Sequence, residues 1–118
     1  MQPKKNKKIY LIYSPELGES GLHKIGIAKQ PEKRLKQLQT GCPYKLEIIY
    51  IVESKFTSKV EKFLHKKFSH KKNVQKFDQN LKGEWFNLDV SDILEFKKTC
   101  SEIERKLEFL EKERNPFV

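Results

Sequence analysis

The chain has 118 residues, of which 36% are hydrophobic and 35% are charged, and its formal net charge is +9. This length suits one domain with an appended helix, and no apolar run approaches the roughly 20 residues of a membrane span. The basic N-terminus lacks the cleavage site of a secretory signal, and the two cysteines supply neither a disulfide framework nor a zinc-binding pair, so we expect an intracellular protein.

The positive charge is unevenly distributed. Residues 1–80 carry 18 Lys and Arg against 7 Asp and Glu, a balance of +11, whereas residues 81–118 carry 7 against 9, a balance of −2. A general lysine bias would enrich both parts and would only give a solvated surface. The asymmetry favours a binding surface for a polyanion, most simply nucleic acid.

The N-terminal third predicts a basic arm followed by a hairpin. Residues 1–8 are polar and basic, as in a flexible arm. The segments "KIYLIY" and "LHKIGIA" then alternate like strands around a loop that contains Pro and Gly. Ile9 and Leu11 point to one face of the first strand and Tyr10 to the other. On the second strand, Lys24 also points away from the aliphatic side chains.

The middle of the chain predicts two helices and a third strand. In "QPEKRLKQLQTG", Pro31 suits the first position of a helix and Gly41 its end. The segment "KLEIIYIVES" is apolar enough to be a central strand of the sheet. The segment "TSKVEKFLHKKFS" predicts a second helix, with an apolar stripe formed by Val60, Phe63, Leu64 and Phe68.

The last third predicts a long loop, a short strand and a long helix. The segment "HKKNVQKFDQNLKG" has weak periodicity, "EWFNL" is typical of a strand, and Ser91 with Asp92 is expected to cap the C-terminal helix. The apolar positions of that helix follow a short coiled-coil spacing: Ile93, Phe96, Cys100, Ile103, Leu107 and Leu110. Little more than two heptads cannot decide whether this seam packs on the domain or pairs with a second copy in a homodimer.

Together these elements predict an α+β fold. We expect a small, central, mostly antiparallel sheet of three to four strands, flanked by helices and followed by a long C-terminal helix. Residues 9–90 would form the domain, and residues 91–118 would form the helix.

Some polar side chains are not required by such a core: Tyr10, Lys24, Arg34, Glu61 and His65. Glu61 and His65 are four residues apart and therefore share one face of the second helix. Each has a structural explanation, and for Glu61 it is a capping box with Ser58. We expect the face that carries Tyr10 and Lys24 to be where Arg34 and Glu61 meet them.

The order of five segments adds a second line of argument. "YLIY", "HKIGIA", "RLKQLQTGCP", "EKFLHKKF" and "GEWFNL" resemble, in that order, the motifs of the GIY-YIG endonuclease superfamily. The closer resemblance is to its phage-associated branch, whose domain is also found in the meiotically up-regulated gene family. It covers about residues 9–90 and implies metal-dependent hydrolysis of DNA phosphodiester bonds, in the cytoplasm of a bacterial or virus-infected cell.

The resemblance also implies roles for the candidate residues. Glu61 would bind a single divalent cation, Mg²⁺ or Mn²⁺, Arg34 would stabilise charge on the phosphate, and Tyr10 would assist deprotonation of the attacking water. Three features depart from the superfamily pattern: Lys8 replaces a glycine, Lys24 replaces a tyrosine, and the late asparagine of the superfamily has no assigned counterpart among Asn73, Asn80 and Asn87. Lys24 then either serves as the base or contacts a phosphate, and the site includes His65 beside Glu61.

Several lysines are candidates for sequence-independent phosphate contacts: Lys29, Lys66, Lys67, Lys71 and Lys72. Trp85 and Phe86 are expected to pack in the sheet, with stacking on a base as the alternative. Two other functional hypotheses stay open. One is a nucleic-acid-binding module that keeps the fold without turnover, and the other is an interaction protein that dimerises through its last helix.

Overall fold

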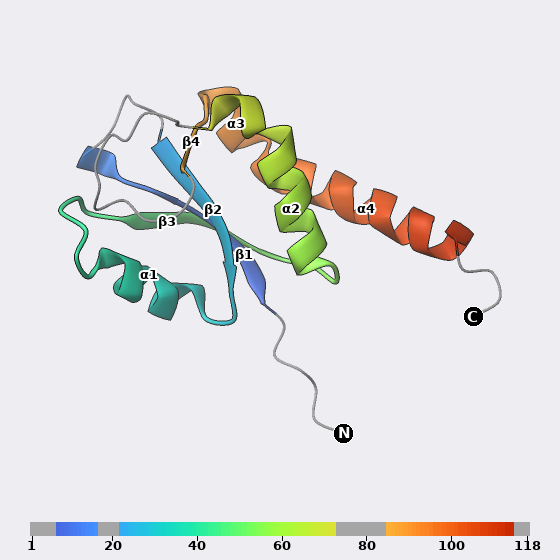
Figure 1. Ribbon diagram of the computed structural model, residues 1–118, viewed down its shortest axis with the longest axis horizontal. Helices are drawn as coiled ribbons and strands as arrows, with labels where there is room; N and C mark the ends of the chain where they lie inside the picture. The colour runs from blue at the N-terminus through green and yellow to red at the C-terminus, as the bar shows by residue number, and fades with distance from the viewer. Residues whose placement is uncertain (1–6, 17–21, 73–84, 115–118) are drawn as a thin grey trace, which may run out of the picture.

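The computed structural model describes residues 7–16, 22–72 and 85–114, and it has the α+β fold expected from the sequence (Figure 1). The predicted N-terminal arm, up to residue 6, and most of the predicted long loop, residues 73–84, lie outside the described residues. The elements are β1 (Lys8–Tyr13), β2 (Leu22–Ala28), α1 (Pro31–Gln39), β3 (Glu47–Glu53), α2 (Thr57–Lys67), the short 3₁₀ helix η2 (Ser69–Lys71), β4 (Trp85–Asn87), α3 (Val90–Leu94) and α4 (Phe96–Arg114).

The described sheet has four strands in the order β3-β1-β2-β4, and every pairing is antiparallel. The hairpin of β1 and β2 is confirmed, with Tyr10 opposite Gly26 and Ile12 opposite Lys24. The expectation that β3 is central was wrong, because β3 forms an edge. Its apolar sequence has another cause: Ile48 packs in the cluster on the α1 side, and Tyr50 packs in the core on the α4 side.

Helices cover the two faces of the sheet unequally. Helix α1 lies on one side of the strands, and α2 and α4 lie on the other (Figure 1). The larger core joins Ile9 and Leu11 of β1 to side chains of α2 and α4. The smaller cluster contains Tyr10 and Ile12, with Leu35 and Leu38 of α1 packed against it. Alternate residues of one strand therefore serve two different packing environments.

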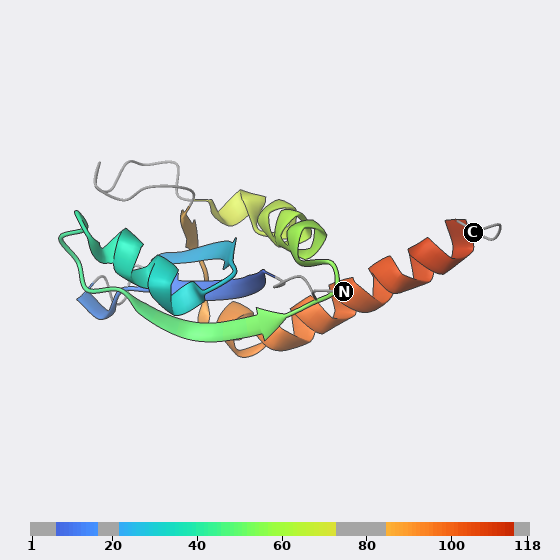
Figure 2. The ribbon, with the colours of Figure 1, turned by 90° about the horizontal axis from the view of Figure 1, so that it is seen from below.

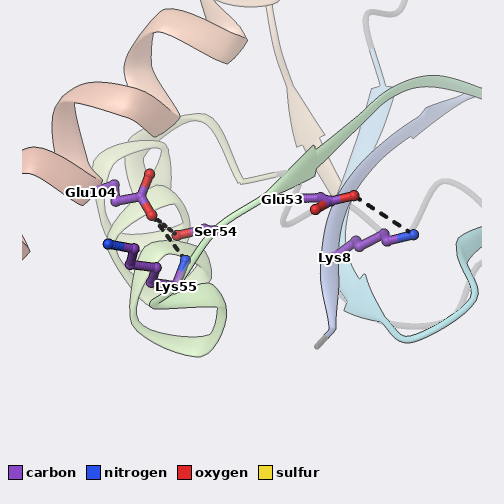
Figure 3. A pocket seen from close by; sticks show the side chains of 5 residues that line it. All are labelled: Lys8, Glu53, Ser54, Lys55 and Glu104. Atoms are coloured by element: carbon purple, nitrogen blue, oxygen red, sulfur yellow. Dashed lines mark hydrogen bonds and ion pairs between the residues drawn. The ribbon is translucent and has the colours of Figure 1, made fainter. Parts of the chain in front are cut away.

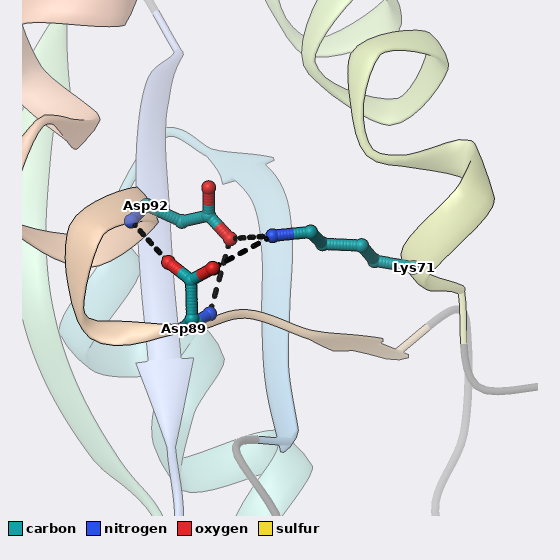
Figure 4. A network of polar contacts seen from close by, with 3 residues as sticks. All are labelled: Lys71, Asp89 and Asp92. Atoms are coloured by element: carbon teal, nitrogen blue, oxygen red, sulfur yellow. Dashed lines mark hydrogen bonds and ion pairs between the residues drawn. The ribbon is translucent and has the colours of Figure 1, made fainter.

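The predicted start of the C-terminal helix was also wrong. Asp89, not Ser91, is the N-cap, because Asp89 accepts a hydrogen bond from the Asp92 amide and Asp92 accepts one from the Asp89 amide. This capping box starts the short helix α3, and α4 begins separately at Phe96. The same two carboxylates bind Lys71 Nζ, 3.1 Å from Asp89 Oδ2, which fastens η2 to α3 (Figure 4).

The predicted apolar seam packs on its own domain over the first part of α4. Phe96 and Cys100 are buried, and Ile103 and Leu107 are partly buried against the same core. Leu110 is 45% exposed, and the C-terminal part of the helix projects beyond the sheet (Figure 2). On α2, Phe63 is also 45% exposed, so the predicted stripe of that helix loses one member.

A polar pocket of about 370 Å³ marks the junction of β1, β3 and α4 (Figure 3). Glu104 of α4 accepts hydrogen bonds there from the Lys55 amide at 2.9 Å and the Ser54 hydroxyl at 3.2 Å. Lys8 lies 3.9 Å from Glu53 across the same pocket. The pocket therefore ties α4 to the turn after β3, and its lining includes none of the predicted catalytic residues.

Candidate functional site

Tyr10 lies against the backbone of the neighbouring strand. Its side chain is 2% exposed, and its cross-strand partner is Gly26. A β-carbon placed on Gly26 would lie 2.9 Å from Tyr10 Cε1 and closer still to the hydroxyl group. Only glycine leaves this space open, so Gly26 determines where the Tyr10 ring and hydroxyl lie. This role of Gly26 was not predicted from the sequence, although a glycine inside a strand was a signal for it.

The charges of Arg34 and Glu61 both act on the Tyr10 hydroxyl. Burial raises the pKa of Tyr10, a hydrogen bond and the positive charge of Arg34 lower it, and the negative charge of Glu61 raises it. The net effect raises the pKa, so the hydroxyl keeps its proton at neutral pH. Arg34 is itself exposed on α1, where its Nη1 donates to Gln37 Oε1 at 3.2 Å.

Glu61 reaches this group from the opposite side of the sheet. Helix α2 packs on the opposite face of the sheet, where Leu64 belongs to the same core as Ile9 and Leu11, and the charge of Glu61 nevertheless acts on Tyr10. The capping-box explanation for Glu61 was wrong. Helix α2 begins after Phe56, and no side chain caps it. The Glu61 carboxylate is thus available at the margin of the sheet, with its side chain 25% exposed.

His65 lies one helical turn after Glu61, at the same margin. Its Nε2 is 2.9 Å from the carbonyl oxygen of Ile25 in β2 and 3.8 Å from Glu61 Oε2. Its ring meets the Phe86 ring edge-on, with centroids 5.0 Å apart and an interplanar angle of 74°. These contacts place the Glu61 turn beside the part of β2 that carries Gly26.

Lys24 lies on the Tyr10 face, two residues before Gly26. Its side chain is 9% exposed, and its Nζ is 6.0 Å from the centre of the Trp85 ring. Trp85 and Phe86 are both buried, which confirms that this pair packs in the sheet. Neither ring is open to stack on a base. Glu84, just before this pair, lies outside the described residues.

The five predicted phosphate-binding lysines have different surroundings in the structure. Lys29, Lys66 and Lys72 are exposed. Lys67 lines a groove between α2 and α4, on the side of α2 away from Glu61. Lys71 is bound by Asp89 and Asp92, as Figure 4 shows, and these carboxylates raise its pKa.

Lys62 is a further candidate for phosphate binding that was not predicted from the sequence. It is exposed, it follows Glu61 directly, and it lies three residues before His65. That spacing places Lys62 and His65 on neighbouring positions of the helix surface. The i, i+3 relation to His65 was the signal that could have identified it.

Taken together, charges carried by helices on both faces act on one side chain, Tyr10, which packs over Gly26. Tyr10 and Arg34 come from the α1 side, Glu61 comes from the α2 side, and Gly26 offers no side chain between them. Among the described residues, no three His, Cys, Asp or Glu side chains form a complete metal cage. A single carboxylate nevertheless fits Mg²⁺, which keeps several waters and completes its shell with substrate phosphates.

A family model described as the T5orf172 domain matches residues 7–101. The chain belongs to the T5orf172 domain family. The match spans every described strand and reaches the first turns of α4, so the predicted site lies inside the T5orf172 domain. No curated protein and no solved structure matches the chain.

The T5orf172 domain gives the coarse functional class. It is a phage-associated domain related to endonucleases, so the chain is a nuclease-like or nucleic-acid-binding module, with DNA as the partner that this class indicates. In the described part of the chain, no helix is both long and apolar enough to cross a membrane.

Proposed function

We propose that this T5orf172 domain is a GIY-YIG-type endonuclease that hydrolyses DNA phosphodiester bonds. The observation that carries the proposal is that the Tyr10 hydroxyl, packed over Gly26, is acted on by the charges of both Arg34 and Glu61. A phenol, a guanidinium and a carboxylate are three groups that phosphodiester hydrolysis can use together. The basic balance of residues 1–80 supports a polyanionic substrate.

Each residue has a chemical task in this proposal. Glu61 would hold one Mg²⁺ or Mn²⁺, which when bound would neutralise phosphate charge and acidify a water. The exposed Arg34 guanidinium would pair with two phosphate oxygens in its planar fork. Tyr10 keeps its proton at neutral pH, so it would orient the attacking water by hydrogen bonding. Lys24, on the same face, would contact the phosphate.

The deciding experiment is nicking of supercoiled DNA in the presence of Mg²⁺ or Mn²⁺. We expect the wild type to convert the plasmid and Glu61→Gln to lose about 10²–10³-fold in rate, as when one preorganised contact is removed. Glu95→Gln removes an exposed carboxylate between α3 and α4 and is the matched control. An inactive wild type, or equal rates for wild type and Glu61→Gln, would exclude the nuclease.

The alternative function is a nucleic-acid-binding module without turnover. One observation favours it: Lys24, which stands where the superfamily has a tyrosine, is almost buried against Trp85. This alternative predicts DNA binding that weakens steeply with salt, unchanged by Glu61→Gln and without cleavage. Filter binding at several salt concentrations, run beside the nicking assay, separates the two functions.

We also propose that the groove between α2 and α4 binds a second copy of the chain. The groove measures about 350 Å³, and Leu107 and Leu110 line it together with Lys67 and Lys106. The projecting end of α4 carries the exposed Glu111 and Glu113 after the same apolar positions. The groove also includes Glu102 and the helix end also includes Lys112, so the match between them rests on their apolar side chains, and a two-fold axis would satisfy both copies at once.

Sedimentation equilibrium tests this homodimer. We expect a concentration-dependent dimer in the wild type and a monomer for Leu110→Glu. Phe109→Glu is the control, because Phe109 is 62% exposed and does not line the groove. A wild type that stays monomeric at every concentration would remove the proposal.

A further inference from the structure

His65 differs from the other candidate residues in that its ring is bound to the sheet backbone. Its Nε2 lies 2.9 Å from the Ile25 carbonyl oxygen. A carbonyl oxygen can only accept a hydrogen bond, so Nε2 carries the hydrogen in this contact. The Nε2 lone pair is then not available to remove a proton from water, and only Nδ1 can be unprotonated.

The position of this bond along β2 gives it a structural consequence. Strand β4, as described, pairs with Leu22–Lys24, and Ile25 is the next residue of β2. The His65 imidazole thus takes the place of a strand partner directly beyond this pairing. It fastens α2 to β2 one residue before Gly26, the residue that carries the Tyr10 ring on its backbone.

Two further contacts hold the imidazole in one orientation. The buried Phe86 ring meets it edge-on at 5.0 Å, and Phe86 is the cross-strand partner of His23 in β2. Nε2 also faces Glu61 Oε2 at 3.8 Å, too long for a hydrogen bond but close enough for an electrostatic contact. The ring therefore touches the sheet, the core and the carboxylate together.

We infer that His65 is a positioning residue that holds the Glu61 carboxylate beside Tyr10 through its bond to the Ile25 carbonyl. The inference rests on the proposed nuclease function. It assigns His65 a positioning role in place of the acid–base role that a histidine could have in such a site. A partner that orients a metal-binding side chain typically affects metal affinity or activity 10–100-fold. His65 acts through Glu61 and does not itself touch the substrate.

The test compares two substitutions that separate the hydrogen bond from the ring. His65→Gln keeps an N–H donor that can reach the Ile25 carbonyl, and His65→Phe keeps the ring contact with Phe86 but has no donor. We expect His65→Phe to weaken Mn²⁺ binding, measured by calorimetry without DNA, by about 10-fold or more. We expect His65→Gln to stay close to wild type in Mn²⁺ binding and to keep the shape of the pH–rate profile of nicking.

Three results would overturn the inference. The first is wild-type Mn²⁺ affinity in His65→Phe. The second is loss of one limb of the pH–rate profile in His65→Gln, which would make His65 an acid–base group. The third is an Nδ1-protonated tautomer in the long-range ¹⁵N spectrum of the wild-type imidazole. Glu95→Gln, with thermal unfolding of all variants, controls for loss of fold.

Failure of this inference differs from failure of the proposed function. If Glu61→Gln abolishes Mn²⁺ binding and nicking while His65→Phe matches wild type in both, the nuclease stands and the positioning role falls. If the wild type binds Mn²⁺ at Glu61 but never cuts DNA, the nuclease falls. The effect of His65→Phe on Mn²⁺ affinity then still decides the positioning role.

Discussion

The two faces of the sheet differ in what covers them. The α2 and α4 face is closed by an apolar core that includes Leu64, Phe86 and Phe96, each completely buried. The α1 face is covered by the nine residues of one short helix, whose Leu35 and Leu38 are only partly buried. On this second face the strands present polar groups among their apolar residues.

This difference suggests a division of work between the two faces. Tyr10, Lys24 and Arg34 belong to the less covered face, and Arg34 is the one of the three that is exposed to a substrate. The carboxylate of Glu61 is carried on a helix that is anchored in the closed core, and its charge acts on Tyr10. The closed face supplies most of the stability and also the rigid support for one reactive group.

The largest expected effect compares the cores of the two faces. Phe96→Ala should lower the free energy of unfolding by about 3–5 kcal/mol, because it empties a closed core. Leu38→Ala should cost less, about 1–2 kcal/mol, because that side chain is only partly buried. Urea denaturation of both variants measures the difference. Equal losses would show that the α1 face is as important for stability as the other.

The sequence predicted the strands and helices well because their signals are local. Alternation gave β1 and β2, and Pro31 and Gly41 gave the limits of α1, with Gly41 at a positive φ of 83°. The prediction failed where the structure depends on contacts between residues that are distant in sequence. The apolar sequence of β3 results from burial on both faces of the strand. An edge strand that helices cover on both faces therefore has the same kind of sequence as a central strand.

The candidate site residues were proposed from the sequence, but their geometry was not. The motif order proposed Tyr10, Arg34 and Glu61, and the charges of Arg34 and Glu61 both act on the Tyr10 hydroxyl. Strand alternation cannot tell which face a later helix covers, so the approach of Glu61 from the closed face was not foreseen. The binding of Lys71 by Asp89 and Asp92 depends on the capping box of α3, which lies 18 and 21 residues away in sequence.

Gly26→Ala tests the contact that brings the two faces together. The new methyl group would occupy the space of the Tyr10 ring, so we expect a loss of about 1–3 kcal/mol in unfolding free energy together with a loss of nicking. In a Tyr10→Ala background the same change should cost much less. A double-mutant cycle that shows simple additivity would mean that the two residues do not interact.

A smaller effect concerns the protonation of Tyr10 on the less covered face. Its pKa is above the ordinary value of 10.0 because of burial, so the folded state holds this proton more tightly than the unfolded chain. The resulting stability is present below pH 10 and is lost as the pH rises through the folded pKa. Between about pH 9 and pH 11, the unfolding free energy of the wild type should therefore fall more steeply than that of Tyr10→Phe. Parallel curves would contradict the assigned shift.

The smallest effect leaves the fold intact and compares the faces through their two cysteines. Cys100 packs in the closed core, where burial raises the pKa of its thiol to about 12. Cys42 is partly buried and packs against the cluster on the α1 side. At pH 8 only about 10⁻⁴ of a thiol with the pKa of Cys100 is thiolate, so a thiol reagent should modify Cys42 first and Cys100 only when α4 opens. Mass spectrometry of partly modified protein identifies the labelled residue, and Cys42→Ser removes the fast phase. If both thiols were modified at the same rate, α4 would protect its face of the sheet no better than α1 protects the opposite face.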